Sequence, residues 1–214
     1  MNPNMLNRRS MLTGGTLLSL STLLAACVPH DITTAGGAST ASGAAATNSS
    51  SGSSAGSGEY RKADAKGPAQ NVPKPNAPEN GYRDKTPEGI LKTMDAWNQW
   101  VNYGVQTGDY SKAREFLSSS NDGELKIYRE IEALYQRGGW VIDGLEYFKP
   151  AGIPRTDDHQ TYYLETNHEW DKHTEVEPDG RQETWSSDKE EEIYVFALEH
   201  RDGTWQILYS QIDA

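Results

Sequence analysis

Apolar side chains recur every three to four residues in the region that follows residue 85, and this period predicts amphipathic helices. The first predicted helix begins at Thr86-Pro87-Glu88, because threonine caps a helix, proline suits its first turn and a carboxylate favours its positive end. Its apolar stripe consists of Leu91, Met94, Trp97, Val101 and Val105. Gly108-Asp109 ends this helix. A short second helix is predicted over residues 110–117, and a third over residues 122–137, which Gly138-Gly139 ends.

The period changes to two after residue 139, which predicts strands. Four strands are expected, over residues 140–148, 161–176, 182–200 and 204–212. Turn residues separate them, and Asp202-Gly203 is typical of a two-residue hairpin loop. This order predicts an α+β domain in which three N-terminal helices pack on one face of a curved four-stranded antiparallel meander.

The turns also predict which residues face one another across the sheet. A two-residue loop at Asp179-Gly180 would place His168 opposite Glu191 and Leu164 opposite Val195. With this register, both faces of the sheet are apolar near its carboxyl end. Because helices cover only one face, we expect a second copy of the chain to cover the outer face in a homodimer.

The first 26 residues have the order of an export signal, in which Arg8 and Arg9 precede a mostly apolar run over residues 11–26. This run is short for a membrane-spanning helix, which needs about 20 apolar residues. Leu24-Ala25-Ala26-Cys27 resembles the lipobox of bacterial lipoproteins. The resemblance implies cleavage before Cys27, a diacylglyceryl group on its thiol, and often an acyl chain such as palmitate on the new amino terminus. The protein would then be anchored to the cell membrane on its extracytoplasmic side.

The residues around Arg8-Arg9 also resemble a twin-arginine export motif, so the sequence leaves the general and the twin-arginine routes open. After the signal peptide (residues 1–26), residues 27–58 are predicted to form a lipidated flexible linker. Gly, Ser, Ala and Thr supply 25 of the 31 residues that follow Cys27. Residues 59–85 are rich in proline, which favours extended backbone. The folded domain is expected over residues 86–214.

Composition and spacing exclude several kinds of site. With 20 basic and 31 acidic residues the formal net charge is −11, which argues against a nucleic-acid-binding surface. The single cysteine excludes an intrachain disulfide and a metal site built from several cysteines. His168 and His173 lie five residues apart on one predicted strand and so point to opposite faces, which does not suit a shared metal ion. No catalytic residue and no cofactor are predicted, because no motif for either occurs.

Two further resemblances concern the folded domain. Three helices followed by a strongly curved meander resemble the cone-shaped nuclear transport factor 2-like fold, which implies a pocket between the helices and the sheet. Several short motifs resemble an actinobacterial lipoprotein family whose domain has no assigned function. These motifs are Lys66-Gly67-Pro68-Ala69-Gln70-Asn71-Val72-Pro73-Lys74-Pro75, Thr86-Pro87-Glu88-Gly89, Trp97, Asn102-Tyr103 and Thr107-Gly108-Asp109. Many members of that family carry a cysteine pair near residues 118–123, which this chain lacks, and the family supplies no activity.

Aromatic residues are the candidates for lining a pocket of this kind. They are Trp97, Tyr103, Tyr128, Trp140 and Tyr162, and the competing interpretation is that they form the core. His168 beside Glu191 is a candidate proton shuttle or else an ordinary cross-strand ion pair. The predicted function is therefore a lipid-anchored extracytoplasmic binding or interaction module of unknown ligand. The alternative is a small-molecule enzyme or carrier that uses the aromatic-lined cone pocket.

Overall fold

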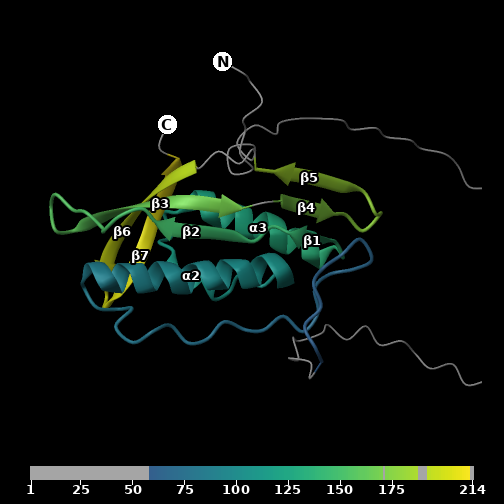
Figure 1. Ribbon diagram of the computed structural model, residues 1–214, viewed down its shortest axis with the longest axis horizontal. Coiled ribbons are helices and arrows are strands. Elements are labelled where there is room, and N and C mark those ends of the chain that lie inside the picture. The colour runs from purple at the N-terminus through teal and green to yellow at the C-terminus, as the bar shows by residue number, and fades with distance from the viewer. Residues whose placement is uncertain (1–57, 171, 188–191, 213–214) are drawn as a thin grey trace, which may run out of the picture.

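The computed structural model of the protein describes residues 58–170, 172–187 and 192–212 (Figure 1). The signal peptide, Cys27, residues 27–57 of the linker and Glu191 lie outside these ranges, so the predictions made for them stay predictions. No helix among the described residues is both long enough and apolar enough to cross a membrane.

The first helix begins and ends at the residues that the sequence predicts. Helix α2 spans Pro87–Thr107, and the hydroxyl of Thr86 accepts a hydrogen bond from the backbone N–H of Gly89 at 3.0 Å. Gly108 ends the helix in the left-handed conformation, with φ of 74°, which glycine adopts without steric cost. Helix α3 spans Asp122–Gln136, and the side chain of Asn121 caps its first turn.

The second predicted helix is wrong. Residues 110–117 contain only a short 3-10 helix, η1 (Ala113–Phe116), so the described part of the chain has two α-helices rather than three. The chain leaves helical geometry at Leu117 because this residue pairs with a strand of the sheet. Leu117 has extended backbone and bridges to Ile207, and the N–H of Ser118 donates to the carbonyl of Ile207 at 2.9 Å. These contacts with a distant strand outweigh the local preference for helix.

The four-stranded meander is also wrong, because three of the predicted strands each divide between two sheets. The first becomes β1 (Trp140–Asp143) and β2 (Glu146–Pro150). The second becomes β3 (Thr161–Trp170) and β4 (Lys172–Val176). The third becomes β5 (Gln182–Ser186) and β6 (Glu192–Arg201), and β7 is Thr204–Ile212. The result is one antiparallel sheet of order β1-β4-β5 and another of order β2-β3-β6-β7.

The division is visible in the backbone between β1 and β2. Asp143 and Gly144 both have positive φ, of 62° and 76°, and a strand cannot continue through two such residues. The carbonyl of Lys172, at the start of β4, accepts a hydrogen bond from the N–H of Gly144 at 2.6 Å. The break in the first predicted strand is therefore joined to the place where β4 begins.

The register predicted across the sheet is off by one residue. His168 lies opposite Glu192 rather than Glu191, and Leu164 lies opposite Phe196 rather than Val195. The two-residue loop predicted at Asp179-Gly180 is wrong as well, because the N–H of Glu177 pairs with the carbonyl of Arg181 and leaves three residues in the loop. The two-residue hairpin at Asp202-Gly203 is confirmed, because Arg201 pairs directly with Thr204.

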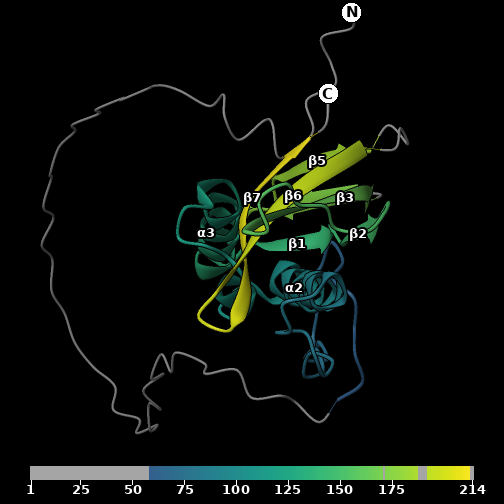
Figure 2. The same cartoon turned by 90° about the vertical axis from the view of Figure 1, so that its left-hand side faces the viewer.

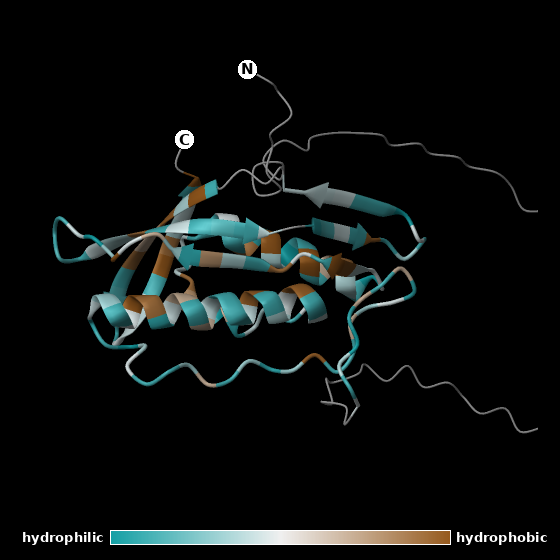
Figure 3. Cartoon of the chain, in the orientation of Figure 1, coloured by the Kyte–Doolittle hydropathy of each residue, from teal (hydrophilic) through white to brown (hydrophobic). Residues whose placement is uncertain are grey.

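The core lies between the two α-helices and the strands. Figure 2 shows α3 beside β7, and α2 below β1 and β2. Apolar and polar residues alternate along these elements (Figure 3), as expected when each buries one side. The indole of Trp97 lies against the rings of Phe148 and Phe196, with centroid distances of 5.5 and 5.4 Å. The largest fully buried side chains are Trp97, Trp205, Tyr110, Tyr128, Tyr194 and Phe196.

The proline-rich segment before α2 lies along that helix, on the side away from the strands (Figures 1 and 2). At its beginning, Arg61 bridges to Gln70 and Asp64 to Gly67, which makes a small hairpin. The carbonyl of Asp64 accepts a hydrogen bond from Nε1 of Trp140 at 2.9 Å. At the other end of the segment, Asp84 accepts one from Nε1 of Trp205 at 2.8 Å. Both ends of the segment are thus held by tryptophans of the sheets.

Candidate functional site

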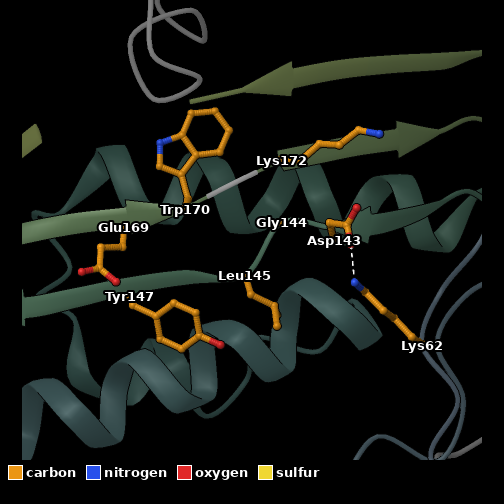
Figure 4. Close-up of a pocket in the computed structure, with 8 residues that line it drawn as sticks. All are labelled: Lys62, Asp143, Gly144, Leu145, Tyr147, Glu169, Trp170 and Lys172. Carbon is orange, nitrogen blue, oxygen red and sulfur yellow. Dashed lines mark ion pairs between the residues drawn. The ribbon is translucent and has the colours of Figure 1, made fainter. Parts of the chain in front are cut away.

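A surface pocket of about 380 Å³ lies where the two sheets separate (Figure 4). Its walls come from the ends of β1, β2, β3 and β4, together with the N-terminal hairpin. The lining residues are Lys62, Asp143, Gly144, Leu145, Tyr147, Glu169, Trp170 and Lys172. The pocket therefore combines two aromatic rings, one exposed and one partly buried, with four charged side chains.

The Asp143-Gly144 turn gives the pocket its shape. A β-carbon on Gly144 would lie 2.4 Å from Nδ1 of His173, so only glycine fits at this position without displacing a neighbour. The turn sends the chain from one sheet to the other and brings Leu145 between the aromatic and charged ends of the pocket (Figure 4).

Two ion pairs lie at the rim of the pocket. The ammonium of Lys62, from the N-terminal hairpin, is 2.6 Å from Oδ1 of Asp143. The carboxylate of Glu169 is 2.6 Å from the ammonium of Lys149, which lies outside the pocket lining. The lining itself holds two lysines and two carboxylates. Because Lys149, from outside the lining, pairs with Glu169, Lys172 is the lining lysine that forms no ion pair among the described residues.

The aromatic wall consists of Tyr147 and Trp170. Tyr147 is 48% exposed, although aromatic residues of a small domain usually enter its core. Trp170 is partly buried, and its indole stacks at 6.4 Å on the imidazole of His168. One side of the Trp170 ring thus contacts His168, while part of its surface remains open to solvent.

His168 itself is enclosed between two carboxylates. Its Nε2 lies 3.0 Å from Glu146 and its Nδ1 3.3 Å from Glu192. The ring stacks on Phe148 at 4.6 Å, and only 2% of the His168 side chain is exposed. Both contacts are hydrogen bonds to ionised carboxylates only when both ring nitrogens carry protons. This arrangement suits a buried structural hydrogen-bond network better than a proton shuttle, which needs contact with a substrate.

The aromatic residues predicted to line one pocket lie in different surroundings. Trp97 and Tyr128 are fully buried, and Nε1 of Trp97 donates to the hydroxyl of Tyr128 at 2.9 Å. Tyr103 is buried against Trp100 with ring centroids 5.5 Å apart, and this burial raises the pKa of its phenol.

The other predicted residues lie elsewhere again. Trp140 and Tyr162 are partly buried, the first against Asp64 and the second against Trp205 at 5.2 Å. Of the predicted residues that the structure describes, only His168 adjoins the surface pocket, through its contact with Trp170.

Sequence reasoning missed every residue that lines the surface pocket. One signal was available, because Asp-Gly is a turn dipeptide and Asp143-Gly144 interrupts the strand predicted over residues 140–148. Nothing in the local sequence shows that Lys62, far away in the chain, approaches this turn.

The profile of one protein family, DUF6318, described as a family of unknown function, matches residues 58–211 of the chain. No curated protein matches. The family match begins at the N-terminal hairpin, and so includes the segment that supplies Lys62 to the pocket.

Three solved structures have partial similarity. A protein from Novosphingobium aromaticivorans, provisionally described as an aromatic ring hydroxylase, shares 12% identity over 59% of this chain and 87% of its own, with a TM-score of 0.39. A calcium/calmodulin-dependent protein kinase II association domain, also a provisional description, from Xanthomonas campestris shares 15% over 59% and 85%, with a TM-score of 0.32. Bd1075 from Bdellovibrio bacteriovorus shares 12% over 58% and 39%, with a TM-score of 0.32.

Proposed function

The chain belongs to the family of unknown function DUF6318, and from this premise we propose that it is a non-catalytic binding module, anchored by lipid on the extracytoplasmic side of the cell membrane. The observation that carries the binding role is the pocket at the junction of the two sheets. It is lined by the rings of Tyr147 and Trp170 beside charged side chains, a combination typical of ligand sites.

We propose no catalytic activity for this protein. His168, with its two carboxylates, is the strongest acid–base candidate of the predicted residues, and its side chain is almost completely buried. The aromatic residues of the predicted cone pocket include Trp97 and Tyr128, which are occupied in core packing. A binding role requires neither group to reach a substrate.

The anchor and the tether rest on the sequence. Leu24-Ala25-Ala26-Cys27 supplies the lipobox-like site, and residues 28–58 supply a linker long enough to separate the domain from a membrane surface. In the original host, wild-type protein is expected in the detergent-extracted membrane fraction. Replacement of Cys27 by alanine is expected to remove the protein from that fraction. Unchanged membrane extraction of the variant would contradict the lipid anchor.

The outer face of the sheet β2-β3-β6-β7 supports the proposal of a homodimer. Tyr163 pairs with Ala197, which pairs with Tyr209, so these three lie in one row across the sheet. Tyr163 and Tyr209 are 38% and 41% exposed, and Ile193, which alternation along β6 places on the same face as Ala197, is 39% exposed. We expect sedimentation of the full chain to give a dimer that Tyr209→Arg dissociates. A monomer at tens of micromolar would overturn this part.

The binding role is tested by native mass spectrometry of the full chain, extracted from its own host without denaturation. We expect a retained small molecule that is lost in the variant Trp170→Ala and kept in Trp100→Ala, which removes an indole that does not line the pocket. A chain that retains nothing, or one whose ligand does not depend on Trp170, would overturn the proposed function.

A further inference from the structure

The pocket has an aromatic end and a charged end. In Figure 4 the rings of Trp170 and Tyr147 lie toward one end, the Lys62–Asp143 pair lies toward the other, and Leu145 lies between them. An apolar body can therefore pack against the rings while a polar group of the same molecule reaches the charged end.

The charged end favours a negative group. The carboxylate of Asp143 is already neutralised by Lys62 at 2.6 Å. The other lining carboxylate, Glu169, lies beside Tyr147 at the aromatic end (Figure 4) and is paired with Lys149 at 2.6 Å. Lys172 lines the same pocket, and in the described part of the chain no carboxylate forms an ion pair with it. In a chain whose formal net charge is −11, a pocket ammonium that pairs with no described carboxylate is a feature that would select for anions.

We propose that this pocket binds a small organic anion, made of a flat apolar body and a carboxylate or phosphate group. Trp170 and Tyr147 hold the flat body, and the ammonium of Lys172 pairs with the anionic group. This inference rests on the proposed binding function, and it names the class of ligand that the pocket takes.

Lys62 gives the inference a second consequence. This lysine comes from the N-terminal hairpin, and its ammonium can pair either with Asp143 or with an anion in the pocket. Asp143 thus competes with the ligand for Lys62. Removing the charge of Asp143 should strengthen anion binding, whereas removing the charge of Lys172 should weaken it.

The experiment uses equilibrium dialysis of the full chain against three probes of one shape: 2-naphthoate, neutral 2-naphthamide and 2-naphthylmethylammonium. We expect 2-naphthoate to bind most tightly. Lys172→Gln should weaken its binding by about three- to fivefold and leave 2-naphthamide unchanged, and Lys172→Arg should restore it. Asp143→Asn should strengthen 2-naphthoate binding by about two- to threefold. Asparagine tolerates the positive φ of this position, so the turn is kept.

The matched controls are Lys126→Gln and Glu130→Gln on α3, which make the same charge changes at residues that do not line the pocket. They separate a local effect from one of net charge, and both should leave all three affinities unchanged. If 2-naphthamide or the ammonium probe binds as tightly as 2-naphthoate, the inferred ligand class is wrong while a binding function stands. If Trp170→Ala changes no affinity, the inference fails because the probes bind elsewhere. Loss of the ligand in native mass spectrometry tests the proposed function separately.

Discussion

The side-chain amide of Asn102 on α2 holds both backbone groups of Glu146 at the start of β2. The N–H of Glu146 donates to Oδ1 of Asn102 at 2.9 Å, and Nδ2 of Asn102 donates to the carbonyl of Glu146 at 2.8 Å. A carboxamide offers the same donor and acceptor as a peptide group, so Asn102 takes the place of a neighbouring strand beside β2. Asn98, one turn earlier, donates to the same carbonyl at 2.9 Å.

This contact joins helix α2 to the buried network around His168 and to the surface pocket. The carboxylate of Glu146 lies 3.0 Å from Nε2 of His168 in the buried network, and the next residue, Tyr147, lines the pocket. Because α2 fixes the backbone of Glu146, it also positions Tyr147, one of the two rings in the aromatic wall of the proposed binding site.

We predict that Asn102→Ala lowers the free energy of unfolding by about 2–3 kcal/mol, because it leaves the buried N–H of Glu146 without its acceptor. Urea unfolding measures this change. Asn98→Ala is the matched control and should cost only about 1 kcal/mol, since the carbonyl of Glu146 keeps the bond from Asn102. Equal losses in the two variants would contradict the role given to Asn102.

The short motifs that suggested a family turn out to include residues that hold the fold together. Besides Asn102, the hydroxyl of Thr107 donates to the carbonyl of Tyr103 at 2.8 Å and accepts from the N–H of Asp109 at 3.1 Å. Gly108 supplies the left-handed end of α2. The assignment to a family of unknown function is confirmed. The actinobacterial lipoprotein character and the cone-shaped fold stay predictions.

Local signals predicted local structure. Thr86 and Gly108 at the ends of α2, and the hairpin at Asp202-Gly203, were correct because a cap or a tight turn depends on a few adjacent residues. The division of three strands between two sheets was missed. Alternation of apolar residues continues through a bend such as Asp143-Gly144, and it does not record which neighbour each half acquires.

The pocket was missed for a related reason. The sequence shows that Trp97 and Trp170 are large and aromatic, and both fit a core or a ligand site equally well. Only the fold shows that Trp97 is enclosed by Phe148 and Phe196, whereas Trp170 stands where the sheets separate. Lys62 could not be assigned from the sequence, since its partner Asp143 is 81 positions away.

The two tryptophans give a direct test of that assignment. Trp97→Ala should lower the free energy of unfolding by about 3–5 kcal/mol, because it empties the centre of the core. Trp170→Ala should cost only about 1 kcal/mol, because its ring is partly exposed and stacks on His168 of the same strand, β3. Urea unfolding of both variants measures the difference. Similar losses would mean that Trp170 is part of the core and that the pocket has been misassigned.

A further prediction concerns the turn that shapes the pocket. Gly144→Ala should lower the free energy of unfolding by more than Gly180→Ala does. Both glycines have positive φ, of 76° and 84°, so alanine costs each about 1–2 kcal/mol of backbone strain. At Gly144 the new methyl group also meets His173, whereas nothing lies within 4 Å at Gly180. Overpacking should add at least about 1 kcal/mol at Gly144. Thermal unfolding of the two variants measures these losses of stability. Equal losses would contradict the tight packing inferred for the turn.

The last prediction concerns stability at alkaline pH. Tyr135 on α3 donates its hydroxyl to the carbonyl of Val105 at 2.9 Å and accepts from the N–H of Val141 at 3.3 Å, which joins both helices to β1. Burial raises the pKa of this phenol to about 12. Because the pKa in the folded protein lies above the ordinary value of about 10, the neutral phenol stabilises the fold below pH ~10, and this contribution is lost as the pH rises toward ~12.

Tyr135→Phe removes the titration of this group and the two hydrogen bonds together. At neutral pH the variant should be less stable than the natural chain by about 1 kcal/mol. Between pH ~10 and ~12 the natural chain should lose about 2 kcal/mol relative to the variant, so the order of the two stabilities reverses. Urea unfolding at a series of pH values measures this difference, in which the titration of the other tyrosines cancels. A difference that does not change with pH would show that the phenol of Tyr135 has an ordinary pKa and is open to solvent.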